Sequence, residues 1–203
     1  MPDPTLKNKT VKGMIWNSID KFGSYLVSFI IGVILARILM PSDYGKIGML
    51  SIFFALSELF VSSGFSQALI QKKDRTELDF STIFYFNIAV AVIFYLILFL
   101  LAPSISEFFK TPQLTILTRI LSLNIIINSL ALVQQTRLTI KLDFKKQAII
   151  SLAAVIISGA AGLISAFKGL GVWALVIQSI TSSTIRTILM FYLGRWSPAM
   201  VFN

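Results

Sequence analysis

Six long apolar stretches fill most of this 203-residue chain. Each is close to the roughly 20 residues that an α-helix needs to cross about 30 Å of hydrocarbon. We therefore predict an all-α fold, a polytopic membrane bundle of six transmembrane helices that forms a single unit over residues 1–203. The predicted spans are residues 14–38, 46–70, 82–102, 114–135, 147–167 and 171–193.

Composition excludes the soluble classes of protein. Hydrophobic residues make up 56% of the chain and charged residues 13%, whereas soluble domains average about 25% charged residues. The net charge of +9 does not indicate nucleic acid, because a nucleic-acid-binding protein gathers its bases on one folded face. Here the bases flank apolar stretches, so we expect membrane lipids as partners and no nucleic acid.

Turn residues mark the connections between the stretches. Pro41 begins a Pro-Ser-Asp turn after the first span, and Gly169 and Gly171 frame the last connection. Pro103 and Pro112 are expected to bracket the third connection.

Lys and Arg residues are concentrated on alternate connections. Eleven of them lie in the two tails and in the second and fourth connections, whereas the other connections hold three, Lys46, Lys110 and Lys168. Short loops rich in Lys and Arg remain in the cytoplasm. Both termini are therefore predicted to be cytoplasmic.

Residue types for catalysis are scarce in this chain. It contains no His and no Cys, which excludes Ser-His and Cys-His nucleophiles and the common zinc sites. No phosphate-binding glycine loop is present, so the chain is not itself an ATPase. We predict that it is not an enzyme and needs no metal or cofactor. The alternative is an enzyme of membrane lipids that uses Asp20 or Glu58 as acid or base.

Glu58 is the most informative ionisable residue inside a span. A charge at the bilayer centre costs at least about 2.5–3.5 kcal/mol on insertion scales, so such residues face a partner or a hydrated cavity. Glu58 lies near the middle of the second predicted span and shares a helix face with Ser51, Ala55 and Ser62. Two interpretations are open: a protonated or hydrogen-bonded structural acid, and a direct role in transport.

Asp20, Lys21 and Arg186 share one depth, about two turns from the cytoplasmic ends of the first and sixth spans. Lys21 is long enough to reach the interface. Asp20 is short, so we predict that it pairs with Arg186. Arg119 lies roughly 8 Å below its helix start at 1.5 Å per residue, where it is within reach of Glu58 or of an anionic ligand.

The fourth and sixth spans carry polar faces. Asn124, Asn128 and Gln135 lie within about 60° of one another on a helical wheel at 100° per residue. Gln178 and Arg186 belong to a second polar stripe. Together with Glu58 they predict a hydrated cavity that holds hydroxyl groups and a negative charge. The alternative is hydrogen bonding between helices without transport.

Five stretches of this sequence resemble the amino-terminal half of bacterial polysaccharide flippases of the O-antigen type, which belong to the multidrug/oligosaccharidyl-lipid/polysaccharide superfamily. They are TVKGMIWNSIDKFG, ILARILMPSDYGKIGM, SSGFSQALIQKKDRTELDFSTIFYFN, RLTIKLDFKKQ and GLGVWALV. The resemblance covers nearly the whole chain. It implies a transporter that moves lipid-diphosphate-linked oligosaccharide across the bacterial inner membrane by rocking two six-helix lobes around a central cavity, often cationic.

On this resemblance the chain ends at Asn203, where a second lobe would begin, so a missing carboxyl-terminal lobe is an expected partner. Cations attract a diphosphate in a low-dielectric cavity, and amides donate to sugars. The expected substrate-binding residues are Lys21, Arg119 and Arg186 for the diphosphate and Asn124, Asn128, Gln135 and Gln178 for the sugar. Asp20 or Glu58 would carry a proton or balance the charge.

Two alternative functions remain open. A cation-coupled multidrug exporter of the same superfamily would prefer cationic cargo and an acidic cavity, and four bases against two acids within the spans disfavour it. A structural membrane partner without transport activity would instead be a closed, fully packed bundle.

The orientation can be tested in this cysteine-free background. A cysteine at Thr111 is expected to react with an impermeant thiol reagent from outside the cell, and a cysteine at Lys73 only from the cytoplasmic side, because of the charge distribution. The opposite labelling pattern would show that the orientation is inverted.

Overall fold

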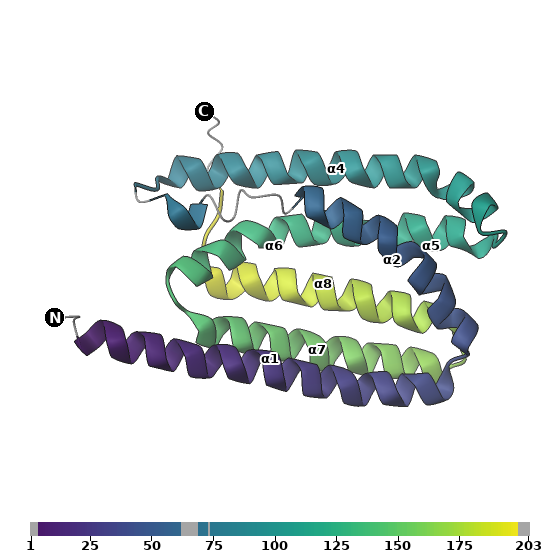
Figure 1. The fold of residues 1–203 in the computed structure, drawn as a ribbon, viewed down its shortest axis with the longest axis horizontal. Coiled ribbons are helices and arrows are strands. Elements are labelled where there is room, and N and C mark those ends of the chain that lie inside the picture. Colours follow the sequence, from purple (N-terminus) through teal and green to yellow (C-terminus); the bar gives the residue numbers. More distant parts are fainter. Residues whose placement is uncertain (1–3, 62–68, 73, 199–203) are drawn as a thin grey trace.

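The computed structural model describes residues 4–61, 69–72 and 74–198, and these residues are predominantly helical (Figure 1). Within them, six helices are long and apolar enough to cross a membrane, which confirms the predicted number of spans. The short α5 and the longer α6 together make one of the six. The helices are α1 (Pro4–Ile38), α2 (Pro41–Val61), α4 (Glu77–Phe108), α5 (Gln113–Leu121), α6 (Leu123–Ile140), α7 (Phe144–Phe167) and α8 (Val172–Gly194).

Two helices are much longer than the apolar stretches that predicted them. The 35 residues of α1 span about 52 Å at 1.5 Å per residue, more than the hydrocarbon thickness. In α4, the Thr76 side chain accepts from the Asp79 backbone and the Asp79 side chain accepts from the Thr76 backbone, a capping box that starts the helix ahead of its apolar run. The end of the predicted second span, residues 62–68, lies outside the described residues.

The predicted turn residues are confirmed at two connections and for Pro112 at the third, where Pro112 directly precedes α5. Pro41 begins α2, and Gly169 and Gly171 adopt positive φ angles of 75° and 54° in the last connection. Such angles suit glycine because it has no Cβ. Pro103, however, lies inside α4, which continues to Phe108.

The spanning helices run in alternating directions (Figure 1). α8 packs against α7 on one side and α6 on the other, and α4 packs against α5 and α6. α1 packs against α7, whereas α2 contacts α4, α6 and α8. Figure 1 shows α1 and α2 diverging from their shared connection. As a result, different helices flank α8 on its two sides.

Small residues allow α7 to approach both of its neighbours. Gly159 faces Ile31 of α1 so closely that an added Cβ would overlap the Ile31 side chain. A Cβ at Gly162 would lie 3.0 Å from the Cβ of Gln178 on α8. Close backbone approach is the main source of helix association where lipid removes the hydrophobic driving force.

A charged and aromatic cluster joins α4, α6 and the segment that follows α8, at the end where α4 begins. The Arg137 guanidinium of α6 donates to both carboxylate oxygens of Glu77 at 2.9 and 2.7 Å, and the Trp196 indole donates to the same carboxylate at 2.7 Å. The guanidinium also lies 4.7 Å from the Phe80 ring centroid and 5.1 Å from that of Trp196. The chain leaving α8 is thereby fixed to α4 and α6.

The alternating directions gather the basic connections at one end of the bundle. The start of α1 and the end of α8 lie on the same side (Figure 1), as an even number of spans requires. Described bases at that end are Lys72, Arg75, Arg137, Lys141, Lys145, Lys146 and Arg195. The connections at the opposite end hold Lys46, Lys110 and Lys168.

Candidate functional site

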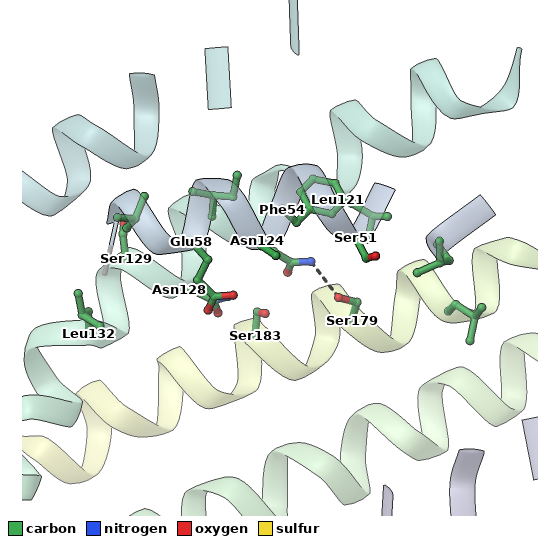
Figure 2. A pocket seen from close by; sticks show the side chains of 15 residues that line it. Ser51, Phe54, Glu58, Leu121, Asn124, Asn128, Ser129, Leu132, Ser179 and Ser183 are labelled. Atoms are coloured by element: carbon green, nitrogen blue, oxygen red, sulfur yellow. Dashed lines mark hydrogen bonds between the residues drawn. The ribbon is translucent and has the colours of Figure 1, made fainter. Parts of the chain in front are cut away.

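Two polar cavities flank α8. The first, which we call the α2–α6–α8 cavity, has a volume of about 360 Å³ (Figure 2). Its polar lining consists of Ser51, Glu58, Asn124, Asn128, Ser129, Ser179 and Ser183. Apolar side chains including Phe54, Leu121 and Ile125 complete the wall.

Glu58 projects into the α2–α6–α8 cavity near the middle of the bundle. It lies at the level of Ser183 (Figure 2), which is the central residue of α8. The structure thus brings Glu58 together with Asn128 and Ser51. Ser62, which was expected on the same face, lies outside the described residues.

Asn124 connects two walls of this cavity and keeps an acceptor free. Its Nδ2 donates to Ser179 Oγ at 2.9 Å (Figure 2). Its Oδ1 is buried and has no hydrogen-bond partner among the described residues. An unpaired buried carbonyl costs about 1–3 kcal/mol, so a ligand hydroxyl or a water at this position would be stabilised.

The second cavity, which we call the α1–α7–α8 cavity, has a volume of about 300 Å³. It carries two bases and one acid together with several hydroxyl groups. Its polar lining consists of Asp20, Lys21, Ser24, Tyr25, Ser28, Ser151, Ser182 and Arg186. The two cavities therefore differ in charge: this one is suited to an anion.

Asp20 and Arg186 share this cavity, as their common depth predicted, but the predicted direct pairing is wrong. No ion pair joins them in the described part of the chain. Asp20 accepts from Ser24 Oγ at 3.3 Å, one helical turn away. Arg186 Nη2 donates to Gln135 Oε1 at 3.3 Å, and its Nε is buried with no described partner. Arg186 therefore keeps a free donor for an anion.

Arg119 lies outside both cavities. Pro103 has no N–H, which leaves the carbonyl of Phe99, four residues earlier in α4, without its helical partner. Arg119 Nε donates to that carbonyl at a long 3.5 Å, and its guanidinium lies 4.3 Å from the Phe99 ring centroid. The structure thus directs Arg119 to the interruption in α4 and not towards Glu58.

The two glutamines expected to bind sugar are placed differently. Gln135 contacts Arg186 and orients its guanidinium. Gln178 packs against Gly162 between α7 and α8 and lines neither cavity. The expectation that Gln178 and Glu58 line one cavity is therefore wrong, because α8 presents Gln178 to α7.

Sequence reasoning did not find Ser179 and Ser183, which form the α8 wall of the first cavity. The sequence pattern that could have revealed them is their spacing of four residues, which puts them on one helix face. Each directly follows a residue of the polar stripe formed by Gln178, Ser182 and Arg186. Successive helical residues differ by 100°, so a rotation by one residue moves a side chain from one cavity to the other.

Six helices that are long and apolar enough to cross a membrane define a multi-pass membrane protein. Residues 34–203 match the family described as polysaccharide biosynthesis protein. The chain therefore belongs to that family.

Relatives with related roles align along almost the whole chain. It is 26% identical over 201 residues to the succinoglycan biosynthesis transport protein ExoT of Rhizobium meliloti, covering 98% of this chain and 41% of the relative. It is 26% identical to the teichuronic acid biosynthesis protein TuaB of Bacillus subtilis, covering 98% of this chain and 42% of that protein. It is 25% identical to the lipopolysaccharide biosynthesis protein WzxC of Escherichia coli, covering 98% of this chain and 41% of that protein.

The chain thus spans about two fifths of the length of these relatives and corresponds to their amino-terminal part. No solved structure matches it.

The structural role of Arg119 can be separated from ligand binding. Arg119→Leu should lower the free energy of unfolding by about 1.5–3 kcal/mol, because the free Phe99 carbonyl loses a charged donor. In a Pro103→Ala background the restored N–H binds that carbonyl, so the same change should cost much less. A double-mutant cycle by denaturant unfolding of the purified protein measures this coupling.

Arg37→Leu, at the exposed end of α1, is the control and should cost the same in both backgrounds. Equal losses for Arg119→Leu in the two backgrounds would contradict the assignment.

Proposed function

We propose that this chain is the amino-terminal lobe of an exporter that moves a lipid-diphosphate-linked oligosaccharide across the bacterial inner membrane. Membership of the polysaccharide biosynthesis family supports a role in polysaccharide export, as do the names of ExoT and WzxC. The coverage of about two fifths of each relative supports a further lobe as partner.

The observation that carries the proposal is the cationic α1–α7–α8 cavity. Lys21 and Arg186 line it with one carboxylate, Asp20. A phosphate group is bound strongly by Arg because two N–H groups donate in parallel, and Lys adds a compact charge. Gln135 acts as a positioning residue for Arg186. Asp20 balances the charge or carries a proton while the cavity is empty.

The depth of the cationic cavity supports entry of the substrate from the basic end of the bundle. Lys21 lies six residues after Ile15, where the apolar part of α1 begins, which is about 9 Å at 1.5 Å per residue. With both termini in the cytoplasm, as the basic connections indicate, the diphosphate group meets the cavity close to the cytoplasmic face.

Alternating access needs two bundles that rock around a site near the midplane. Glu58 is exposed on α2, level with Ser183 at the centre of α8, and polar groups in contact with lipid carry a free-energy cost. A second lobe against α1 and α2 would shield this face and close the pathway on one side at a time.

Neutralising the two bases tests the diphosphate assignment. Lys21→Gln and Arg186→Gln should each weaken binding of purified chain to lipid-diphosphate oligosaccharide by roughly tenfold or more, since a charged hydrogen bond contributes about 1.5–3 kcal/mol. Arg37→Gln, a base of α1 outside both cavities, is the matched control. Unchanged binding in both variants would contradict the assignment.

Export by the chain alone gives an independent result. In a flippase-deficient cell, these 203 residues should not restore polysaccharide export unless a carboxyl-terminal lobe is coexpressed. Robust export by a demonstrated monomer would contradict the two-lobe proposal.

A further inference from the structure

The α2–α6–α8 cavity is chemically unlike its neighbour across α8. No Lys or Arg is among its described lining residues, and its charged group is the carboxylate of Glu58. The other polar groups are amides and hydroxyls, which both donate and accept hydrogen bonds.

A phosphate group does not suit this cavity. Like charges repel strongly when they lie a few ångströms apart in a medium of low dielectric constant. Glu58 would therefore oppose a phosphate, and no cation in the described lining offsets that repulsion.

A neutral, polyhydroxylated ring suits it well. Each sugar hydroxyl both donates and accepts hydrogen bonds. Neighbouring hydroxyls can therefore donate to the Glu58 carboxylate, while Asn128 and Ser183 form the other hydrogen bonds of these hydroxyls. The unpaired Oδ1 of Asn124 can accept a hydrogen bond from a further sugar hydroxyl. Phe54 adds an apolar surface to the wall for the C–H face of the ring. Small-molecule pockets usually have this composition, with a few polar groups among apolar side chains.

α8 holds the two cavities in a fixed relation. Ser182 lines the cationic cavity, and Ser183, the next residue, lines the α2–α6–α8 cavity. Their side chains point about 100° apart around the helix. A substrate bound to both cavities would have its phosphate beside Ser182 and its sugar beside Ser183.

We propose that the α2–α6–α8 cavity is a subsite for a neutral sugar unit, held by Glu58, Asn124, Asn128, Ser179 and Ser183 and separated by α8 from the phosphate subsite. This inference rests on the proposed function, because it assumes a substrate that contains both groups.

Two neighbouring serines give a matched pair of reporters in this cysteine-free chain. Ser182→Cys and Ser183→Cys are labelled separately with a small methanethiosulfonate reagent in the purified full chain. The probes are methyl β-glucoside, methyl α-galactoside and N-acetylglucosamine as neutral sugars, inorganic pyrophosphate as the anion and tetraethylammonium as a cation.

At least one neutral sugar should slow labelling of Ser183→Cys by roughly tenfold at ten times its Kd, because only the empty site reacts. The same sugar should leave Ser182→Cys unchanged. Adding Asn124→Leu or Glu58→Gln to Ser183→Cys should remove the sugar protection. As the control for folding, Asn124→Leu or Glu58→Gln is added to Ser182→Cys, and pyrophosphate should still protect this cysteine if the fold is intact.

Each other result has a definite meaning. Absence of sugar protection up to the solubility limit overturns the subsite, and pyrophosphate protection of Ser182→Cys would then leave the proposed diphosphate site standing. Sugar protection without pyrophosphate protection supports the subsite and counts against the diphosphate site. Protection of Ser183→Cys by tetraethylammonium but by no sugar identifies a cation site and overturns the inference. Equal protection of both serine positions by one probe overturns the separation by α8.

Discussion

The need to pair every polar group inside hydrocarbon organises this structure. Where the chain itself breaks a hydrogen bond, as Pro103 does, the Arg119 guanidinium donates to the free carbonyl. Where an amide faces another helix, as Asn124 does, it bonds a hydroxyl on α8. Unsatisfied groups are costly in lipid, and two polar side chains that keep an unpaired buried atom, Asn124 and Arg186, line the two cavities beside α8.

Packing decides how the polar groups beside α8 are divided. Gly159 and Gly162 bring α7 close to α1 and α8, and this places the α1 charges on one side of α8. α2 approaches α8 from the other side and carries Glu58 there. The result is a cationic cavity and a neutral-to-acidic cavity a single residue apart on one helix, an arrangement that matches a ligand with an anionic part and a polyhydroxylated part.

The sequence predicts how deep a residue lies in the membrane far better than it predicts which way the side chain points around its helix. The six spans, the central level of Glu58 and the common depth of Asp20 and Arg186 all follow from position along apolar stretches. The partners of Arg119 and Arg186, and the orientation of Gln178 towards α7, depend on how each helix is rotated against its neighbours. That rotation is fixed by contacts such as Gly162 with Gln178. Capping at Thr76 extends α4 beyond its apolar run in the same way, through local hydrogen bonds that hydropathy does not record.

We expect the polar face of α2 to border water and not lipid. Nitroxide labels at Ser51, which lines the cavity, and at Ile52, which is 68% exposed, lie at nearly the same depth on different faces. In bilayers, with a carboxyl-terminal lobe coexpressed to cover this face, power saturation should show that a water-soluble nickel complex collides more often with the label at Ser51, and that oxygen collides more often with the label at Ile52. Oxygen-dominated collisions at both positions would place the α2–α6–α8 cavity in lipid and contradict a hydrated polar face on α2.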